Sequence, residues 1–329
     1  MEKIINITFD YELFFGSASG TVKKCLIDPT NRLMDMAKTL NVKLVFFVDA
    51  GFLWHLKKYL HIEQCKSDFN LISQQLKQLT ACGHEIGLHV HPHWEDSIYE
   101  NSSWKMNVSR YKLSDFNNSG AEQIITKYHQ TLIEITGKSC TSFRAGGWCI
   151  QPFSKIKKAL EKNNIFTDSS VFKNGFHQYT AQSYDFRKAP QKTEWRFEED
   201  ECLEDVSGKF TELAITPDKI FPWFYFKLYL CMNLNPSAFK PLGDGTWLKD
   251  KNKQRKQFYA LTNHFACCDG LFASRLNSIL LNLESQNANR MVVLGHPKSL
   301  AECSFKYLKN FIEFAKNKNY KITTLTEPN

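Results

Sequence analysis

The sequence lacks several patterns that would place it in well-known classes of protein. No two of its ten cysteines form a C-x-x-C pair, which excludes a zinc ribbon and a thioredoxin-type redox motif. No apolar run reaches the roughly eighteen residues that a transmembrane helix needs, so we expect no membrane span. The net charge of +8 is mild for 329 residues, and its densest basic run, residues 249–256, predicts only a solvated loop. We therefore expect no nucleic-acid partner.

The beginning of the sequence also lacks the pattern of a secretory signal. Residues 1–9 run directly into a strand pattern, without a basic region followed by an apolar one. Ten cysteines without such a signal are typical of free thiols in a reducing compartment. The sequence therefore predicts a cytoplasmic protein.

Strand-like and helix-like segments alternate along most of the chain. The strand-like runs are residues 4–9, 44–48, 85–88, about 143, 165–167, 291–294 and 322–325. Helical spacing covers residues 67–80, 151–162, 271–283 and 305–315, and a capping-box pattern at Ser119 and Glu122 opens a further helix that Gly137 ends. This alternation predicts an α/β domain with a mainly parallel sheet and outer helices, spanning residues 1–329 without an internal repeat.

An irregular insertion at about residues 184–256 interrupts the alternation. It contains an expected strand at 211–215 and an aromatic helix at 218–232, with Asp218 as a cap and Pro222 in the first turn. A helix buried against the sheet is the first interpretation, and a roof over the substrate is the sharper one. A membrane-surface helix ranks third, because only Lys227 in it is basic.

Reactive side chains follow the expected strands, where the carboxyl ends of parallel strands would bring them together. Asp10 and Glu12 are two residues apart, so their side chains point the same way on an extended chain and suit a base plus a metal ligand. By itself this pair is a weak signal of a catalytic site, because exposed carboxylates commonly follow strands.

Four of the ten histidines, His84, His89, His91 and His93, fall within ten residues. His89 and His93 share one side if the chain turns helically after the strand, and imidazoles so placed suit Zn, Fe, Co or Ni. His91 could be a third ligand, a residue behind the ligands or a substrate contact.

Three further segments carry a candidate residue after a strand. Arg144 could orient a catalytic carboxylate, and Gly146 and Gly147 would allow a ligand to approach the backbone. Asp168 could equally cap a helix. His296 follows a buried strand far along the chain, and the fold would return it to the same rim.

The order of these segments resembles the polysaccharide deacetylases, carbohydrate esterase family four, over nearly the whole chain. The matching residues are Thr8-Phe9-Asp10, His89 to His93, Arg144 to Trp148, Asp168, and Leu294 to His296. The resemblance implies a distorted (β/α) barrel of about seven strands. It implies that Asp10 is the general base, held by Arg144, and that His296 is the general acid, tuned by Asp168. The implied metal ligands are His89 and His93.

The resemblance also implies a reaction and a ligand. A divalent metal ion, zinc first and cobalt, iron or nickel otherwise, would activate water for removal of an N-acetyl group from an amino sugar. The substrate would contact Trp94, Gly147, Trp148 and Leu294. With a cytoplasmic location, the expected partners are an N-acetylated sugar, a sugar nucleotide or a lipid-linked oligosaccharide of surface-polysaccharide synthesis.

The chain departs from the family pattern at three places. Tyr11 replaces a metal-binding aspartate, so we expect Glu12 to be the third protein ligand. Pro92 precedes His93 instead of following it, and Gly146 stands where proline is usual. Two other functions stay open, a small-amide hydrolase on the same scaffold and a non-catalytic glycan-binding relative, which Tyr11 favours.

Overall fold

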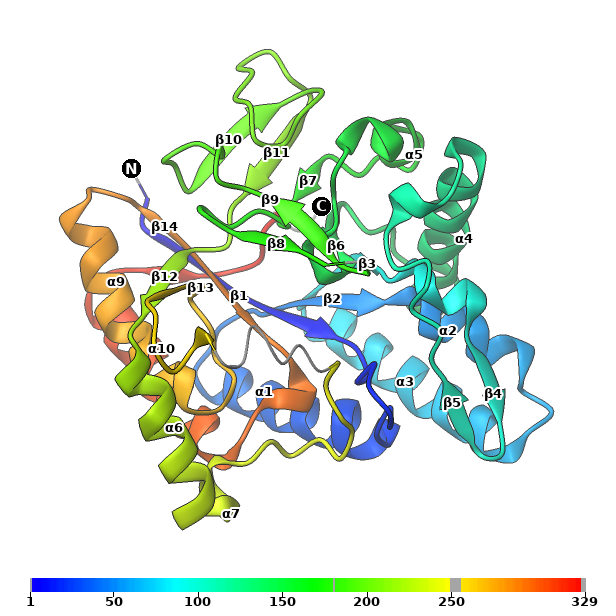
Figure 1. Cartoon of the computed structure of the whole chain (residues 1–329), viewed down its shortest axis with the longest axis horizontal. Helices are drawn as coiled ribbons and strands as arrows, with labels where there is room; N and C mark the ends of the chain where they lie inside the picture. The colour runs from blue at the N-terminus through cyan, green and yellow to red at the C-terminus, as the bar shows by residue number, and fades with distance from the viewer. Residues whose placement is uncertain (1, 180, 249–255, 327–329) are drawn as a thin grey trace.

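The computed structural model describes residues 2–179, 181–248 and 256–326. Most of the predicted basic loop at 249–256 lies outside these residues. Among the described residues, a nine-stranded sheet forms the centre of the molecule (Figure 1). Its order is β10-β11-β7-β6-β3-β2-β1-β14, with β15 paired to β1. The strands are β1 (Ile4–Tyr11), β2 (Val45–Asp49), β3 (Glu85–Val90), β6 (Ser142–Ala145), β7 (Thr167–Asp168), β10 (Glu194–Phe197), β11 (Phe210–Leu213), β14 (Arg290–Gly295) and β15 (Lys321–Ile322).

The sheet curls until its two ends nearly meet. Every pairing along its path is parallel except that of β10 with β11, so seven described strands, from β11 to β14, run in one direction. Just after β11, Thr216 donates its backbone N–H to the carbonyl of Val292 in β14 at 3.0 Å. Ala266, just after β13 (Thr262–Phe265), donates to Thr216 and accepts from Leu294 of β14. The predicted distorted barrel of about seven strands is confirmed.

Helices surround this barrel (Figure 1). They are α1 (Asp28–Thr39), α2 (Ala50–Lys58), α3 (Glu63–Ala81), α4 (Asn118–Thr136), α5 (Lys157–Lys162), α9 (Leu276–Ser285) and α10 (Glu302–Asn317). Short single-turn helices join them, namely η1 (Lys23–Ile27), η2 (Pro92–Asp96), η3 (Leu113–Asp115), η4 (Gly146–Trp148), η5 (Phe153–Lys155), η6 (Gly270–Arg275) and η7 (Pro297–Ser299). Each long helix buries one apolar face on the sheet, as Ile72, Leu76 and Leu79 do on α3.

The two ends of α4 can be compared with the helix start and stop that the sequence predicted. The predicted capping box at Ser119 is wrong, because the cap is Asn117, whose side chain accepts the N–H of Gly120 at 2.7 Å. Gly137 ends the helix as predicted. Its φ of 73° is a left-handed conformation that glycine adopts without steric cost.

The strands are apolar because the barrel covers both of their faces. In β2 all five residues are buried, and in β1 only Ile4 is partly exposed. Packing inside the barrel is close: a side chain at Gly87 would place its Cβ 2.6 Å from the ring of Phe47. One large core cluster joins the sheet to the surrounding helices.

Hairpins and two further helices lie outside this core. The hairpins are β4 (Ile98–Glu100) with β5 (Ser103–Lys105), β8 (Phe176–Gln178) with β9 (Ser183–Asp185), and β12 (Pro217–Ile220) with β13. The predicted insertion at 184–256 is not wholly outside the barrel, because β11 belongs to the sheet. Among the described helices, none combines the length and the apolar character that crossing a membrane would require.

The aromatic helix begins later than expected. It is α6 (Pro222–Leu234), followed by α7 (Pro236–Phe239), at the periphery of the molecule (Figure 1). Asp218 does not cap it, because Asp218 lies in β12 and accepts two hydrogen bonds from Arg275, at 2.6 and 2.9 Å. Only Phe224 and Tyr225 of α6 are buried, in a small cluster separate from the main core.

Candidate active site

The candidate site lies where β1, β3 and β14 end. Residues alternate sides along a strand, so Asp10 and Glu12 face the barrel interior while Tyr11 faces outward. The Tyr11 hydroxyl donates to the side-chain oxygen of Gln75 on α3 at 2.8 Å. Tyr11 therefore helps to pack α3 against the barrel. Glu12 supplies the second carboxylate that faces the barrel interior.

Glu12, His89 and His91 form one of two groups in the described chain that could hold a metal ion; the other is Asp200, Glu201 and Cys202. The Glu12 Oε2 atom lies 2.6 Å from His91 Nε2 and 3.3 Å from His89 Nε2. The two imidazole Nε2 atoms are 3.1 Å apart, and all three side chains are buried. Two nitrogens and one oxygen converging on one point are the ligand set of many catalytic zinc sites.

The two imidazoles differ in how readily they bind a cation. The Nδ1 atom of His89 lies 2.9 Å from the carbonyl oxygen of Arg144, so Nδ1 carries a proton and Nε2 faces the site. Burial lowers the pKa of His89, but Asp10 and then Glu12 outweigh it and raise the pKa overall, so a cation must displace a proton from Nε2. Burial lowers the pKa of His91 to about 4, which keeps this ring neutral at neutral pH. Neutral imidazole is the form that binds metal. The residues present therefore fit a divalent cation.

His93 does not join this group. Its ring stacks between Tyr111 and Trp94, with ring centroids 5.5 and 5.3 Å away, and against Phe15. Both of its ring nitrogens are buried without a hydrogen-bond partner among the described residues. His89 lies within β3, where the side-chain period is two, so His91 shares its side and η2 turns His93 away. The geometry favours His91 over the predicted His93 as the second imidazole ligand.

Arg144 holds Asp10 in place through a hydrogen bond, as the resemblance implies. The Nη1 atom of Arg144 donates to Asp10 Oδ1 at 2.7 Å, and Nε and Nη2 donate to the carbonyl and hydroxyl of Ser169 at 2.6 and 3.0 Å. Burial raises the pKa of Asp10, but Arg144 and then His89 outweigh it, so the pKa is lowered overall. Asp10 is thus an ionised carboxylate with one oxygen fixed and the other free to accept a proton.

His296 faces the same space from β14. Its Nε2 atom lies 3.8 Å from Asp10 Oδ2 and 3.8 Å from Glu12 Oε1. Its Nδ1 atom lies 2.8 Å from Asp269 Oδ2. Burial lowers the pKa of His296, but Asp269 outweighs that effect and the pKa is raised overall. A protonated His296 is the form that can deliver a proton.

The carboxylate beside His296 is therefore Asp269, where the sequence predicted Asp168. Asp168 accepts the backbone N–H and hydroxyl of Ser170 at 3.0 and 2.8 Å and pairs with Glu212 across β7 and β11. Asp269 gave no signal in the sequence, because it follows no expected strand. It reaches the site through the bridge that Cys267 makes with Leu294.

Sequence reasoning also missed Lys298. It is almost fully buried, and its ammonium donates to Glu12 Oε1 at 2.8 Å and to the carbonyl of Leu13 at 2.6 Å. Burial raises the pKa of Glu12, but Lys298 and His91 outweigh it and hold the pKa well below its usual value. Lys298 is two residues after His296, so its proximity to that strand end was the available signal.

Two of the four predicted substrate contacts are deeply buried. Trp94 has no exposed surface, stacks on Phe52 and donates its indole N–H to Asp49 at 2.6 Å. Leu294 is equally buried in the core cluster. This burial disfavours the predicted contact of Trp94 with substrate, because the indole lies in the core behind His93.

Gly147 and Trp148 lie nearer the surface. Gly147 has a φ of 58°, and a Cβ there would approach the Tyr111 ring to 2.7 Å, so only glycine suits this turn. Trp148 is half-buried among Phe172, Tyr184 and Phe265. Their contact with substrate stays a prediction.

The insertion reaches the site through Trp247. Its ring meets His296 edge-on, with centroids 6.0 Å apart, and meets Phe14 with centroids 4.9 Å apart. The Lys298 ammonium lies 5.0 Å from the centroid of the Trp247 ring. Trp247, rather than Trp223 or Tyr225 of α6, is the aromatic side chain of the insertion at the candidate acid.

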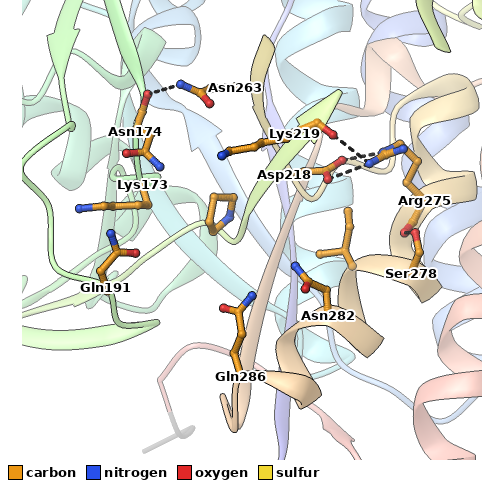
Figure 2. A pocket seen from close by; sticks show the side chains of 12 residues that line it. Lys173, Asn174, Gln191, Asp218, Lys219, Asn263, Arg275, Ser278, Asn282 and Gln286 are labelled. Carbon is orange, nitrogen blue, oxygen red and sulfur yellow. Dashed lines mark hydrogen bonds and ion pairs between the residues drawn. The ribbon is translucent and has the colours of Figure 1, made fainter. Parts of the chain in front are cut away.

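A separate hollow of about 540 Å³ lies between the β12–β13 hairpin and α9 (Figure 2). Carboxamides and cations line it, including Asn174, Gln191, Lys219 and Asn282. It shares no residue with the candidate active site, and the one carboxylate in its lining, Asp218, is paired with Arg275.

Comparison with known proteins identifies the fold. No protein-family model matches the sequence, and no curated protein matches it. A solved structure of a proposed polysaccharide deacetylase from Mycobacterium smegmatis matches over 99% of this chain and 88% of its own, with a TM-score of 0.52 at 15% identity. The chain therefore shares the fold of this proposed polysaccharide deacetylase, as the motif order suggested.

Other solved structures match less closely. A family 4 carbohydrate esterase from Streptomyces lividans, in complex with acetate, has a TM-score of 0.42 at 8% identity, over 98% of this chain and 93% of its own. A CE4 family pseudoenzyme from Bacillus anthracis has a TM-score of 0.44 at 11% identity, over 99% of this chain and 65% of its own.

Proposed function

We propose that the chain is a metal-dependent hydrolase that removes an N-acetyl group from an amino sugar. One observation carries the proposal: a carboxylate held by an arginine, a histidine held by a second carboxylate, and a three-residue group that could bind a cation converge at one end of the barrel. These are Asp10, His296, and the group of Glu12, His89 and His91. The fold shared with a proposed polysaccharide deacetylase supports it.

Each residue of the candidate site has a separate role in the proposed reaction. A divalent cation held by Glu12, His89 and His91 would supply Lewis-acid polarisation of the amide and a lowered pKa for water; zinc is the first candidate, then cobalt, iron or nickel. Asp10 takes the proton of the attacking water through the oxygen that Arg144 leaves free. His296 then protonates the departing amine, and Asp269 holds its ring in the protonated form.

We further propose a cytoplasmic role in surface-polysaccharide synthesis. The substrate would be an N-acetylated sugar, a sugar nucleotide or a lipid-linked oligosaccharide, with Gly147 and Trp148 beside it. The half-buried indole of Trp148, just after β6, leaves part of an aromatic ring on which a sugar could stack.

The direct test is acetate release from N-acetylglucosamine oligomers and from a sugar nucleotide by protein loaded with zinc or cobalt. Simple amides such as N-acetylated alkylamines are assayed beside them. Release from the sugars at rates that Asp10→Asn abolishes supports the proposal. Release from the simple amides alone would make the chain a small-amide hydrolase instead.

Lys298 favours a second candidate, a non-catalytic glycan-binding relative. Its buried ammonium already neutralises Glu12, the carboxylate that a cation would need, and Tyr11 removes the usual second aspartate. Metal analysis of the purified chain separates the two candidates. Sugar binding without retained metal or acetate release supports the binder.

A further inference from the structure

The insertion exposes an unusual amount of apolar surface. Eleven of the twenty large apolar side chains that are exposed in the described chain lie between residues 221 and 261. They are Phe221, Trp223, Phe226, Tyr229, Leu230, Leu234, Trp247, Leu248, Phe258, Tyr259 and Leu261, which we call the aromatic surface. Six of the eleven, from Phe221 to Leu234, lie on or next to one helix, and monomeric soluble proteins rarely expose so many large apolar side chains side by side without a partner.

Helix α6 is the centre of this surface. It is apolar around nearly its whole circumference, with Lys227 as its single charged residue, yet it buries only Phe224 and Tyr225. The exposed fractions of Trp223 and Phe226 are 61% and 58%. An apolar helix of 13 residues is too short to span a bilayer and belongs either in a core or in a membrane interface. Since α6 buries only one side, against the small cluster that contains Ile220 and Leu271, its remaining apolar surface suits a membrane interface.

Composition and charge indicate the same partner. Trp and Tyr concentrate at the boundary between lipid and water, where an apolar ring and a polar group are both satisfied. Lys219, Lys227, Lys240 and Lys256 are exposed in and around the aromatic surface. The one carboxylate among the described residues from 219 to 261, Asp244, already accepts hydrogen bonds from Thr21. Lysines with long apolar stems suit an anionic lipid surface.

We propose that the aromatic surface docks the protein on an anionic membrane, with α6 lying in the lipid headgroup region. From α7 the chain runs directly to the candidate active site (Figure 1), where Trp247 contacts His296. Docking therefore holds the candidate active site near the bilayer. Resting on the proposed function, this placement selects the lipid-linked saccharide among the three substrate classes.

Vesicle flotation of the full chain tests docking without any need for activity. Wild-type protein is mixed with vesicles of phosphatidylcholine containing phosphatidylglycerol, and with vesicles of phosphatidylcholine alone. We expect binding to the anionic vesicles, weakened by high salt because lysines contribute. The Trp223→Ser/Phe226→Ser variant should bind at least about tenfold more weakly, since two aromatic anchors are lost.

A matched control variant is Phe176→Ser/Tyr179→Ser, an exposed aromatic pair outside the aromatic surface. It should float like wild type, and both variants should melt near the wild-type temperature because the changed residues are exposed. Failure of wild type to float with anionic vesicles overturns the proposal. Concentration-dependent dimerisation that only Trp223→Ser/Phe226→Ser abolishes, without vesicle binding, would also overturn it and identify a second copy as the occupant.

Activity gives an independent readout for the substrate class. Trp223→Ser/Phe226→Ser should deacetylate a soluble N-acetylglucosamine oligomer at the wild-type rate but a lipid-linked saccharide in vesicles more slowly. Equal loss on both substrates would contradict the assignment to lipid-linked substrate. Vesicle binding by a wild-type chain that releases no acetate would leave docking in place and reject the proposed function.

Discussion

Two clusters of buried carboxylates lie in the same barrel, and their pKa values are shifted in opposite directions. At the candidate active site, Asp10 and Glu12 face Arg144 and Lys298, and the pKa of each carboxylate is lowered. On the far side of Arg144, Asp168, Glu201 and Glu212 face one another. Burial raises the pKa of all three, that of Glu201 to about 7.

The difference lies in the partners that the fold supplies. Burial raises the pKa of the carboxyls in both clusters, but only in the first do cations outweigh it; in the second, Arg144 lowers the pKa of Asp168 without offsetting its burial. A carboxylate kept ionised can accept a proton or bind a cation. A carboxyl with a raised pKa keeps its proton to higher pH and can donate a hydrogen bond, as Glu212 does to Asp168, so we expect the second cluster to be structural.

The largest effect should come from removing the acid or the base. Asp10→Asn or His296→Ala should lower turnover of an acetylated sugar by roughly 10²–10⁴-fold, because each removes one proton transfer. Steady-state kinetics on purified protein checks this, with circular dichroism to establish folding. Near-normal turnover in a folded variant of either residue would contradict the assignment.

The next effect concerns the metal ligands. Glu12→Gln and His91→Ala should each weaken metal binding by at least about 10–100-fold, since loss of even a supporting residue behind a ligand costs that much. His93→Ala is the matched control and should retain metal, because its ring lies outside the ligand group. Titration with zinc or cobalt measures all three. Metal lost in His93→Ala but kept in His91→Ala would restore the pairing that the sequence predicted.

A smaller effect separates the two candidate partners of His296. Asp269 raises the pKa of His296, so Asp269→Asn should lower that pKa and move the high-pH limb of kcat/KM to lower pH. The sign follows because the acid must be protonated to act. Asp168→Asn should leave that limb in place, since the described contacts of Asp168 are with Ser170 and Glu212. A shift in Asp168→Asn alone would reverse the conclusion.

The smallest effect is on stability in the second cluster. The pKa of Glu201 rises on folding from 4.5 to about 7. Glu201 therefore does not destabilise the folded state below pH 4.5, and the protein loses stability as the pH rises through 7. Glu201→Gln should flatten this fall and be more stable than wild type at pH 8, by about 1–3 kcal/mol. Urea unfolding at several pH values measures it. The exposed Glu199→Gln should match wild type within about 0.5 kcal/mol, and a parallel pH slope in Glu201→Gln would contradict the prediction.

The sequence by itself determined the barrel and most of the rim. Apolar runs such as those of β1 and β14 predict parallel strands because covered strands need apolar residues on both faces. Reactive residues at strand ends then predicted Asp10, Glu12, His89, Arg144 and His296, since strand ends meet at one edge. All five lie together in the structure.

Only the tertiary structure decided which neighbours these residues have. His91, where the sequence predicted His93, lies beside His89 because β3 continues past His89 and a strand places every second side chain on the same side. Asp269, where the sequence predicted Asp168, lies beside His296 because a bridge between segments 27 residues apart brings Cys267 to Leu294, a contact that no local pattern encodes. Lys298 reaches Glu12 across 286 residues for the same reason. Local periodicity predicts which face a side chain occupies, whereas long-range packing decides what it touches.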